Sequence, residues 1–87
     1  MAAALQIWSA TFCKAFDSLP ASVRNAVERK VDEMGTRLKN FPHQRLQGRP
    51  EFKLRVGDFR VLYELDLNQE RIYLHYVGHR RDIYKRT

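Results

Sequence analysis

Cysteine and long apolar runs are scarce in this sequence, and each scarcity excludes a class of protein. Cys13 is the only cysteine, so the chain has no disulfide framework and no cysteine-based metal site. We expect it to be a buried structural thiol in a helix. No apolar run approaches the roughly 18 residues that cross a membrane, and residues 1–5 lack the basic start of a signal peptide. The sequence therefore predicts a cytoplasmic protein without a membrane span.

Acidic residues are too few to balance the basic ones. The chain has 10 Asp and Glu against 16 Lys and Arg, a net charge of +6, and the segment Arg37–Arg60 alone holds seven basic and two acidic residues. This excess favours a polyanionic partner, nucleic acid above all. The 87 residues suffice for one small domain, residues 1–87, whose active site must lie on a face or in a shallow groove.

Residues 52–63 carry the strongest structural pattern of the chain. Apolar residues alternate with other residues on both sides of Gly57-Asp58, as in two strands joined by a two-residue turn. Counting outward from this turn gives the predicted pairs Val56 with Phe59, Arg55 with Arg60, Leu54 with Val61 and Lys53 with Leu62. One face of the hairpin is then wholly apolar.

The other face of this hairpin gathers the three cations Lys53, Arg55 and Arg60. Like charges in direct cross-strand register destabilise a sheet by up to about 1 kcal/mol, so the fold gains nothing from the Arg55 and Arg60 pair. A bound anion would explain it, because guanidinium groups match phosphate oxygens. The alternative is that the three are solvated side chains whose charges are screened by salt.

A short strand and a first helix are predicted at the start of the chain. Residues Leu5–Ser9 alternate as in a strand, and Ser9 or Thr11 can cap the helix that follows. The apolar stripe of this helix consists of Phe12, Phe16 and Leu19, and Pro20 ends it or opens the next helix.

A second amphipathic helix and a loop lead to the hairpin. The helix is predicted from the apolar residues Val23, Val27, Val31, Met34 and Leu38 at helical spacing. The segment Asn40–Pro50 contains two prolines and one glycine, which is typical of a loop. We interpret His43 in this loop as an exposed residue.

A second hairpin is predicted after the first. The strand continues through Glu64–Asp66, the chain turns at residues 67–71, and Ile72–Val77 form the next strand, which Gly78 ends. With Asn68-Gln69 as the turn, the pairs are Asp66 with Arg71, Leu62 with His75 and Arg60 with Val77. This register places Arg71, Tyr73, His75 and His79 on the face of the three cations, and Tyr76 on the apolar face. A slip of one residue would exchange the two faces.

These elements predict an α+β fold. We expect an antiparallel sheet, made of a short N-terminal strand and a three-stranded C-terminal meander, with two helices packed on one face. The segment Arg80–Arg86 adds four basic residues and one acidic residue. These cations could contact a phosphate backbone while Tyr84 stacks on a base; the alternative is a basic tail that Ile83 and Tyr84 hold against the core.

Three stretches of this chain resemble the RelE/ParE superfamily of toxins from toxin-antitoxin systems, and its RelE branch in particular. They are L-Q-G-R-P before the hairpin, K-L-R-V-G-D-F-R-V-L-Y through it, and V-G-H-R-R-D-I-Y near the end. The resemblance implies a single RelE-like toxin domain over residues 1–87. It also implies an endoribonuclease that cuts messenger RNA in the ribosomal A site, by attack of a 2′-hydroxyl on the adjacent phosphate.

The resemblance assigns catalytic roles to four residues. Lys53 matches a position of acid-base or electrostatic function, and Arg60 matches the arginine that stabilises the phosphate as charge builds on it. Arg80 matches an arginine near the leaving oxygen, although Arg81 is an alternative because the tail is short. Tyr84 matches a tyrosine that stacks on the substrate or takes part in proton transfer.

Further cations would bind RNA, namely Arg45, Arg49, Arg55, Arg81 and Lys85. Glu51 departs from the family pattern, which has a second lysine at this position, and it removes a candidate proton carrier. His75 and His79 are fallback acid-base candidates, because histidine titrates near neutrality. The mechanism implies no metal and no cofactor.

The implied partners are mRNA, the ribosome and a cognate antitoxin. Two other functions stay open: a ParE-like toxin that binds a DNA topoisomerase and cleaves nothing, and a homologue that binds nucleic acid without activity. The joint presence of Lys53, Arg55, Arg60, Arg80 and Tyr84 favours the nuclease, because phosphate chemistry needs such a set and topoisomerase binding does not.

Overall fold

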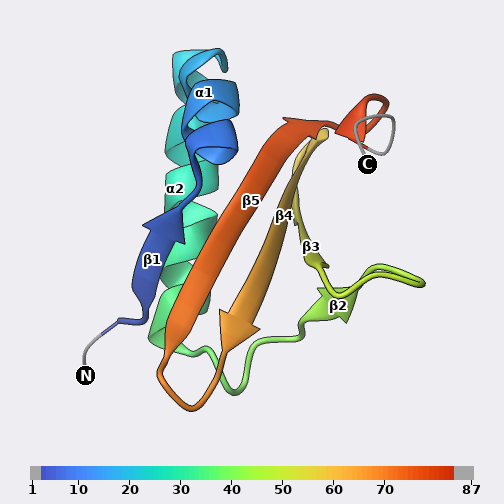
Figure 1. The fold of residues 1–87 in the computed structure, drawn as a ribbon. Coiled ribbons are helices and arrows are strands. Elements are labelled where there is room, and N and C mark those ends of the chain that lie inside the picture. Colours follow the sequence, from blue (N-terminus) through green and yellow to red (C-terminus); the bar gives the residue numbers. More distant parts are fainter. Residues whose placement is uncertain (1–2, 84–87) are drawn as a thin grey trace.

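A computed structural model describes residues 3–83 as a five-stranded sheet with two helices (Figure 1). The elements are β1 (Leu5–Trp8), α1 (Ala10–Asp17), α2 (Ala21–Thr36), β2 (Gln44–Arg45), β3 (Phe52–Val56), β4 (Phe59–Asp66) and β5 (Arg71–His79). The strand order is β1-β5-β4-β3-β2. The predicted α+β class is confirmed, and β2 adds a two-residue edge strand inside the predicted loop. Within the described residues neither helix could span a membrane.

The sheet is antiparallel except at β1, which pairs in parallel with β5. An entirely antiparallel sheet is therefore a wrong prediction for this edge. The path of the chain explains this parallel pairing. Helix α2 returns the chain to the end of the sheet where β1 began, and the chain then reverses its direction twice in the meander of β3, β4 and β5 (Figure 1). Strands β1, β3 and β5 consequently run in the same direction.

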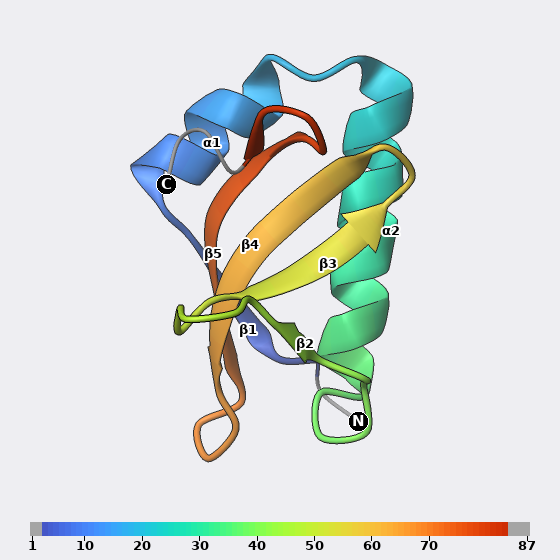
Figure 2. The same ribbon diagram turned by 90° about the vertical axis from the view of Figure 1, so that its right-hand side faces the viewer.

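Both helices bury their predicted stripes against one face of the sheet. The Ser9 hydroxyl accepts a hydrogen bond from the Phe12 N–H at 2.9 Å and so caps α1. Pro20 is the N-cap of α2, which runs along the sheet (Figure 2). The core under the helices includes Phe12, Phe16, Leu19, Val27, Val31, Met34, Leu38, Leu54, Val56, Val61, Tyr63, Ile72, Leu74 and Val77. We call the opposite side of the sheet the outer face.

The β3–β4 register agrees with the prediction at every pair, including Arg55 opposite Arg60. The β4–β5 register agrees only near its turn, where Asp66 pairs with Arg71. Between Leu62 and Tyr63 the register shifts, so that Leu62 pairs with Tyr76 instead of His75. The shift is a bulge in β5, and it lies where β1 ends and no longer supports that strand.

The bulge corrects two predicted side-chain positions. Tyr76 packs with Leu62 on the outer face, and not among the helix-facing apolar residues. His79 pairs with Phe59 on the helix side, where the two rings meet edge to face at 5.5 Å, and not on the face of the cations. His75 has no pairing partner in the β4–β5 register, and its side chain remains on the outer face, as predicted.

A second apolar cluster lies on the outer face. Leu46, Leu62 and Ile83 are buried together there, with Tyr76 packed against them. The segment after β5 thus folds back over the sheet, and Ile83 holds it on the side opposite the main core.

Two interpretations of single residues are wrong. Cys13 is exposed on α1 rather than buried, because the core contacts of this helix are made by Phe12 and Phe16. His43 is half-buried: its Nδ1 lies 2.7 Å from the Tyr63 hydroxyl and its Nε2 lies 2.7 Å from the Leu38 carbonyl oxygen. Sequence alone did not indicate either partner: Leu38 follows α2 in the same loop, and Tyr63 comes from the distant strand β4.

Candidate active site on the outer face

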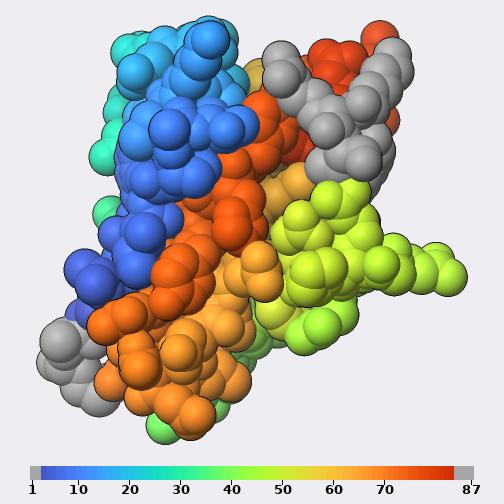
Figure 3. All heavy atoms as spheres, viewed as in Figure 1, coloured from blue at the N-terminus to red at the C-terminus, as the bar shows by residue number. Residues whose placement is uncertain are grey.

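Three cations project from the β3–β4 hairpin onto the outer face. Arg55 and Arg60 are direct cross-strand partners, and Lys53 lies opposite Leu62, which belongs to the outer cluster. Arg55 is exposed, and the other two are partly so. In Figure 3, which views this face, β4 and β5 (orange) form the floor, and the loop before β3 (yellow-green) borders it on one side.

The neighbours of Arg60 define how its guanidinium is held. Its Nη1 donates hydrogen bonds to the carbonyl oxygens of Gly57 and Phe59, both at 2.9 Å. Its partner in β5 is Gly78, which has no side chain to cover it. A guanidinium has five N–H donors, so donors remain for the oxygens of a phosphate.

Arg80 reaches the same hairpin turn from the end of β5. Its backbone N–H donates to the Asp58 carbonyl oxygen at 2.7 Å, and its Nε lies 3.5 Å from the Asp58 carboxylate. Both side chains are more than half exposed, which leaves the pair weak and exchangeable. The turn therefore brings Arg80 to the end of the sheet that carries Arg55 and Arg60.

The residues around Arg80 complete this segment. The Arg81 N–H donates to His79 Nδ1 at 3.2 Å, which fixes its backbone, while the Arg81 side chain is exposed. Tyr84 and Lys85 lie outside the described residues. Their predicted roles therefore receive no structural placement.

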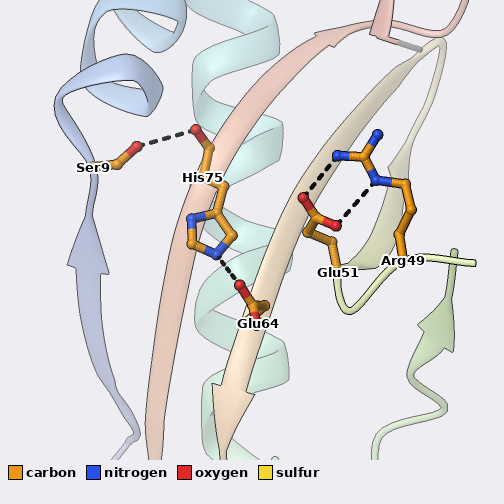
Figure 4. A network of polar contacts seen from close by, with 5 residues as sticks. All are labelled: Ser9, Arg49, Glu51, Glu64 and His75. Carbon is orange, nitrogen blue, oxygen red and sulfur yellow. Dashed lines mark hydrogen bonds and ion pairs between the residues drawn. The ribbon is translucent and has the colours of Figure 1, made fainter. Parts of the chain in front are cut away.

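Arg49 forms a bidentate pair with Glu51. Its Nε and Nη2 donate to the two carboxylate oxygens at 3.1 and 3.0 Å (Figure 4). These hydrogen bonds hold the pKa of Glu51 below its ordinary value and raise the pKa of Arg49, and the nearby charge of His75 also lowers the pKa of Glu51. The charge that Glu51 brings to this face is thus compensated by Arg49, which the sequence suggested as a contact for RNA.

Arg45 lies apart from the three hairpin cations. It pairs with Phe52 across β2 and β3, and its guanidinium carbon lies 4.7 Å from the centre of the Phe52 ring. This cation–π contact holds the Arg45 guanidinium over the Phe52 ring at the edge of the sheet.

A histidine and a carboxylate meet on the outer face. His75 Nε2 lies 2.8 Å from Glu64 Oε2, with side-chain exposures of 37% and 43% (Figure 4). They line a pocket of about 780 Å³ together with Arg45, Phe52, Leu65, Asp66, Leu67, Asn68 and Tyr73. His79, the other fallback candidate, lines a different pocket of about 570 Å³ between α1 and the end of β5.

Glu64, Asp58 and the pairing of Arg49 with Glu51 were not anticipated as parts of the site. For Glu64 a signal existed, because the alternation of β4 places it on the same face as Arg60. The contact between Arg80 and Asp58 had no such signal, since it depends on the path of the chain after β5.

The outer face can stabilise negative charge without a metal. No group of three or more His, Cys, Asp or Glu side chains suited to a metal ion occurs among residues 3–83. Arginines near an exposed turn can place several charge-assisted donors on one phosphate, which is the arrangement that stabilises a phosphorane.

The family comparison covers most of the chain. A family model described as the ParE toxin of the type II toxin-antitoxin system parDE matches residues 7–84. A search of curated protein sequences finds no match.

Solved structures show the same fold at low sequence identity. A chain of the RelBE2 toxin-antitoxin complex from Mycobacterium tuberculosis superposes with a TM-score of 0.76 at 21% identity, covering 94% of this chain and 97% of that chain. The isolated RelE toxin of E. coli gives a TM-score of 0.75 at 18% identity, with 97% and 98% covered. A chain of the RelB-RelE antitoxin-toxin complex from Methanococcus jannaschii gives 0.73 at 21% identity, with 92% and 96% covered.

Proposed function

Because the chain belongs to the ParE toxin family of type II toxin-antitoxin systems, within the RelE/ParE superfamily, we propose that it is a toxin that cuts messenger RNA on the ribosome. Residues 1–87 would form one RelE-like toxin domain that acts in the cytoplasm. The observation that carries the proposal is the direct pairing of Arg55 with Arg60 on an uncovered sheet face, with Arg80 drawn to the same turn. A bound anion would account for this concentration of like charge.

The proposed reaction is a transesterification within the RNA strand. The 2′-oxygen attacks the adjacent phosphorus in line with the departing 5′-oxygen, which yields a 2′,3′-cyclic phosphate and a 5′-hydroxyl. Arg60 and Arg55 would stabilise the charge on the non-bridging oxygens, and Arg80 would act near the leaving oxygen. Lys53 would take part in proton transfer or electrostatic stabilisation, and Tyr84 would stack on the substrate.

The proposed partners are mRNA in the ribosomal A site and a cognate antitoxin. A domain this small has little surface with which to orient RNA by itself, so the ribosome would supply the geometry. Several of the matching structures are complexes of a toxin with its antitoxin, which supports an antitoxin partner for this chain. An acidic antitoxin segment would complement the net charge of +6.

The test is to add the purified protein to a translation extract with programmed ribosomes and to map new 5′ ends on the mRNA. We expect the wild type to cleave the mRNA. Arg60→Ala should cleave it about 10² to 10³ times more slowly, because the variant lacks one donor that stabilises the charge of the transition state. Arg29→Ala is the matched control, because it removes the same charge from the exposed side of α2.

The expected set of results is cleavage by the wild type and by Arg29→Ala, and none by Arg60→Ala within the same time. Intact mRNA in an extract whose ribosomes are programmed and exposed to the wild-type protein would overturn the proposed nuclease. Full activity of Arg60→Ala would overturn the role of the arginine pair.

A second candidate function rests on the family description, which is that of ParE rather than RelE. A ParE-like toxin would bind a DNA topoisomerase and would leave mRNA intact. Inhibition of gyrase supercoiling by the wild type and by Arg60→Ala alike would favour this function. A homologue that only binds nucleic acid would show neither effect.

A further inference from the structure

The bulge in β5 presents His75 to the outer face. Tyr63 pairs with Leu74 and Leu62 pairs with Tyr76, so His75 is the extra residue of the bulge. The Ser9 hydroxyl donates to the His75 carbonyl oxygen at 3.0 Å, and the Ser9 N–H donates to Leu74 O at 3.0 Å, which fixes both sides of this backbone (Figure 4). Bulges of this kind often re-aim a side chain beside an active site.

Glu64 determines which ring nitrogen of His75 carries the proton. An ionised carboxylate only accepts hydrogen bonds, so the contact of 2.8 Å requires an N–H at Nε2. The neutral ring then has its lone pair at Nδ1. No hydrogen bond to Nδ1 exists among the residues that the structure describes, so this atom is available to a ligand.

The charged groups around His75 come from three strands and one loop. Glu64 and Asp66 lie on β4, Tyr73 lies on β5 itself and Arg45 lies on β2, and all four line the same pocket; the Asp66 carboxylate accepts a hydrogen bond from the Gln69 N–H. Glu51 precedes β3 and is close enough for the charge of His75 to affect it, but Arg49 holds its carboxylate. Glu64 is therefore the carboxylate free to act on the ring.

The contact between His75 and Glu64 contributes little to the stability of the fold. Both side chains are more than a third exposed, and an ion pair at such a site contributes about 1 kcal/mol or less. The pocket beside it, at about 780 Å³, has room for a nucleotide. An imidazole that a carboxylate orients and whose second ring nitrogen is open to solvent has the geometry of a general base.

We propose that His75 is the general base of the RNA cleavage, with Glu64 as the residue that positions it. This inference rests on the proposed function. Nδ1 takes the proton of the 2′-hydroxyl as the bond from the 2′-oxygen to phosphorus forms and the bond from phosphorus to the 5′-oxygen breaks. The leaving 5′-oxygen takes a proton from the ammonium group of Lys53, and the solvent restores both groups.

The assignment gives Lys53 the role of proton donor to the leaving oxygen. A lysine carries its proton at neutral pH, so it is a donor before it is an acceptor. Lys53 and His75 lie on the same face, on strands separated only by β4. Neighbouring strands are about 4.8 Å apart, so β3 and β5 are separated by roughly 10 Å. The β4 residue between them, Leu62, is buried with Leu46 and Ile83, so a phosphodiester that reaches both side chains would lie above this apolar cluster.

The test compares single-turnover cleavage on programmed ribosomes over pH 5.5 to 9. The wild-type rate should rise with pH as the imidazole loses its proton and then level off. His75→Ala should be slower by about 10² to 10³ at pH 7, should lose this rise, and should regain activity when free imidazole is added. Glu28→Gln is the control, because it removes a carboxylate from the exposed side of α2.

The positioning role of Glu64 has its own readout. Glu64→Ala should slow cleavage by about tenfold or more, and Glu64→Asp should restore part of the rate. In the free protein, ¹⁵N shifts of the ring should show the proton on Nε2 of neutral His75 in the wild type and a mixture of tautomers in Glu64→Ala.

The results separate this inference from the proposed function. If the wild type cleaves and His75→Ala cleaves equally fast, or is slow without loss of the pH-dependent rise and without imidazole rescue, the inference is overturned and the nuclease stands. If the wild type does not cleave, the nuclease is overturned and the inference with it.

Discussion

His43 links three segments through one imidazole. The Leu38 carbonyl oxygen can only accept, so Nε2 donates to it, and Nδ1 accepts from the Tyr63 hydroxyl. Burial raises the pKa of Tyr63, so this phenol stays protonated and remains the donor. His43 therefore holds the loop before β2 against the core, a structural role that its place beside a proline did not indicate.

Removal of this imidazole should destabilise the protein. We expect His43→Ala to lower the free energy of unfolding by about 1 to 3 kcal/mol, because the Tyr63 hydroxyl and the Leu38 carbonyl lose their partner. Urea unfolding checks this. Tyr63→Phe should cost less in the His43→Ala background than in the wild type, and strictly additive costs would contradict the coupling.

At the scale of elements, Ser9 joins α1 to β5. Its hydroxyl accepts from the Phe12 N–H and donates to the His75 carbonyl oxygen, so one side chain caps the helix and fixes the bulge. Ser9→Ala should lower the free energy of unfolding by about 1 kcal/mol through the cap, and further through the lost bond to β5.

The control for this change is Ser18→Ala, which removes an exposed hydroxyl at the other end of α1. It should shift the free energy of unfolding by no more than about 0.5 kcal/mol. Thermal unfolding measures both variants, and amide exchange should accelerate around residues 74–76 in Ser9→Ala alone. Equal effects of the two changes would contradict the linking role of Ser9.

The elements differ in how far the sequence predicted them. The β3–β4 hairpin was predictable to the residue, because Gly57-Asp58 fixes its turn and one face is apolar throughout. The bulge was not predicted; it coincides with the end of β1 beside β5. The sequence contained one sign of the bulge: an uninterrupted β4–β5 register would have placed the apolar Val77 on the outer face.

At the scale of the whole molecule, acid should weaken the protein through the Arg49 and Glu51 pair. The pKa of Glu51 is lower in the folded chain than in the unfolded one, so the pair stabilises the fold above about pH 4.3, the ordinary value, and this contribution is lost as the pH falls through the folded pKa. Glu51→Gln should therefore be less stable than the wild type at pH 7.

The difference between the two proteins should shrink and vanish as the pH approaches 2. Urea unfolding at several pH values measures it. Glu33→Gln is the control, because its pair with Arg37 is about half exposed on both sides and should contribute little. A stability difference for Glu51→Gln that is constant over this range would contradict the assignment.

The sequence by itself determined the α+β class, the helix stripes, the β3–β4 hairpin and the cations on its outward side. These follow from local periodicity and from turn residues, which act over a few positions. The tertiary structure decided the parallel edge strand, the side on which His79 lies, the second apolar cluster over Leu62, and the pairs that hold Arg80, Arg49 and His75. Each of these depends on which distant segments the packing of the helices brings together, and periodicity along the chain does not record that.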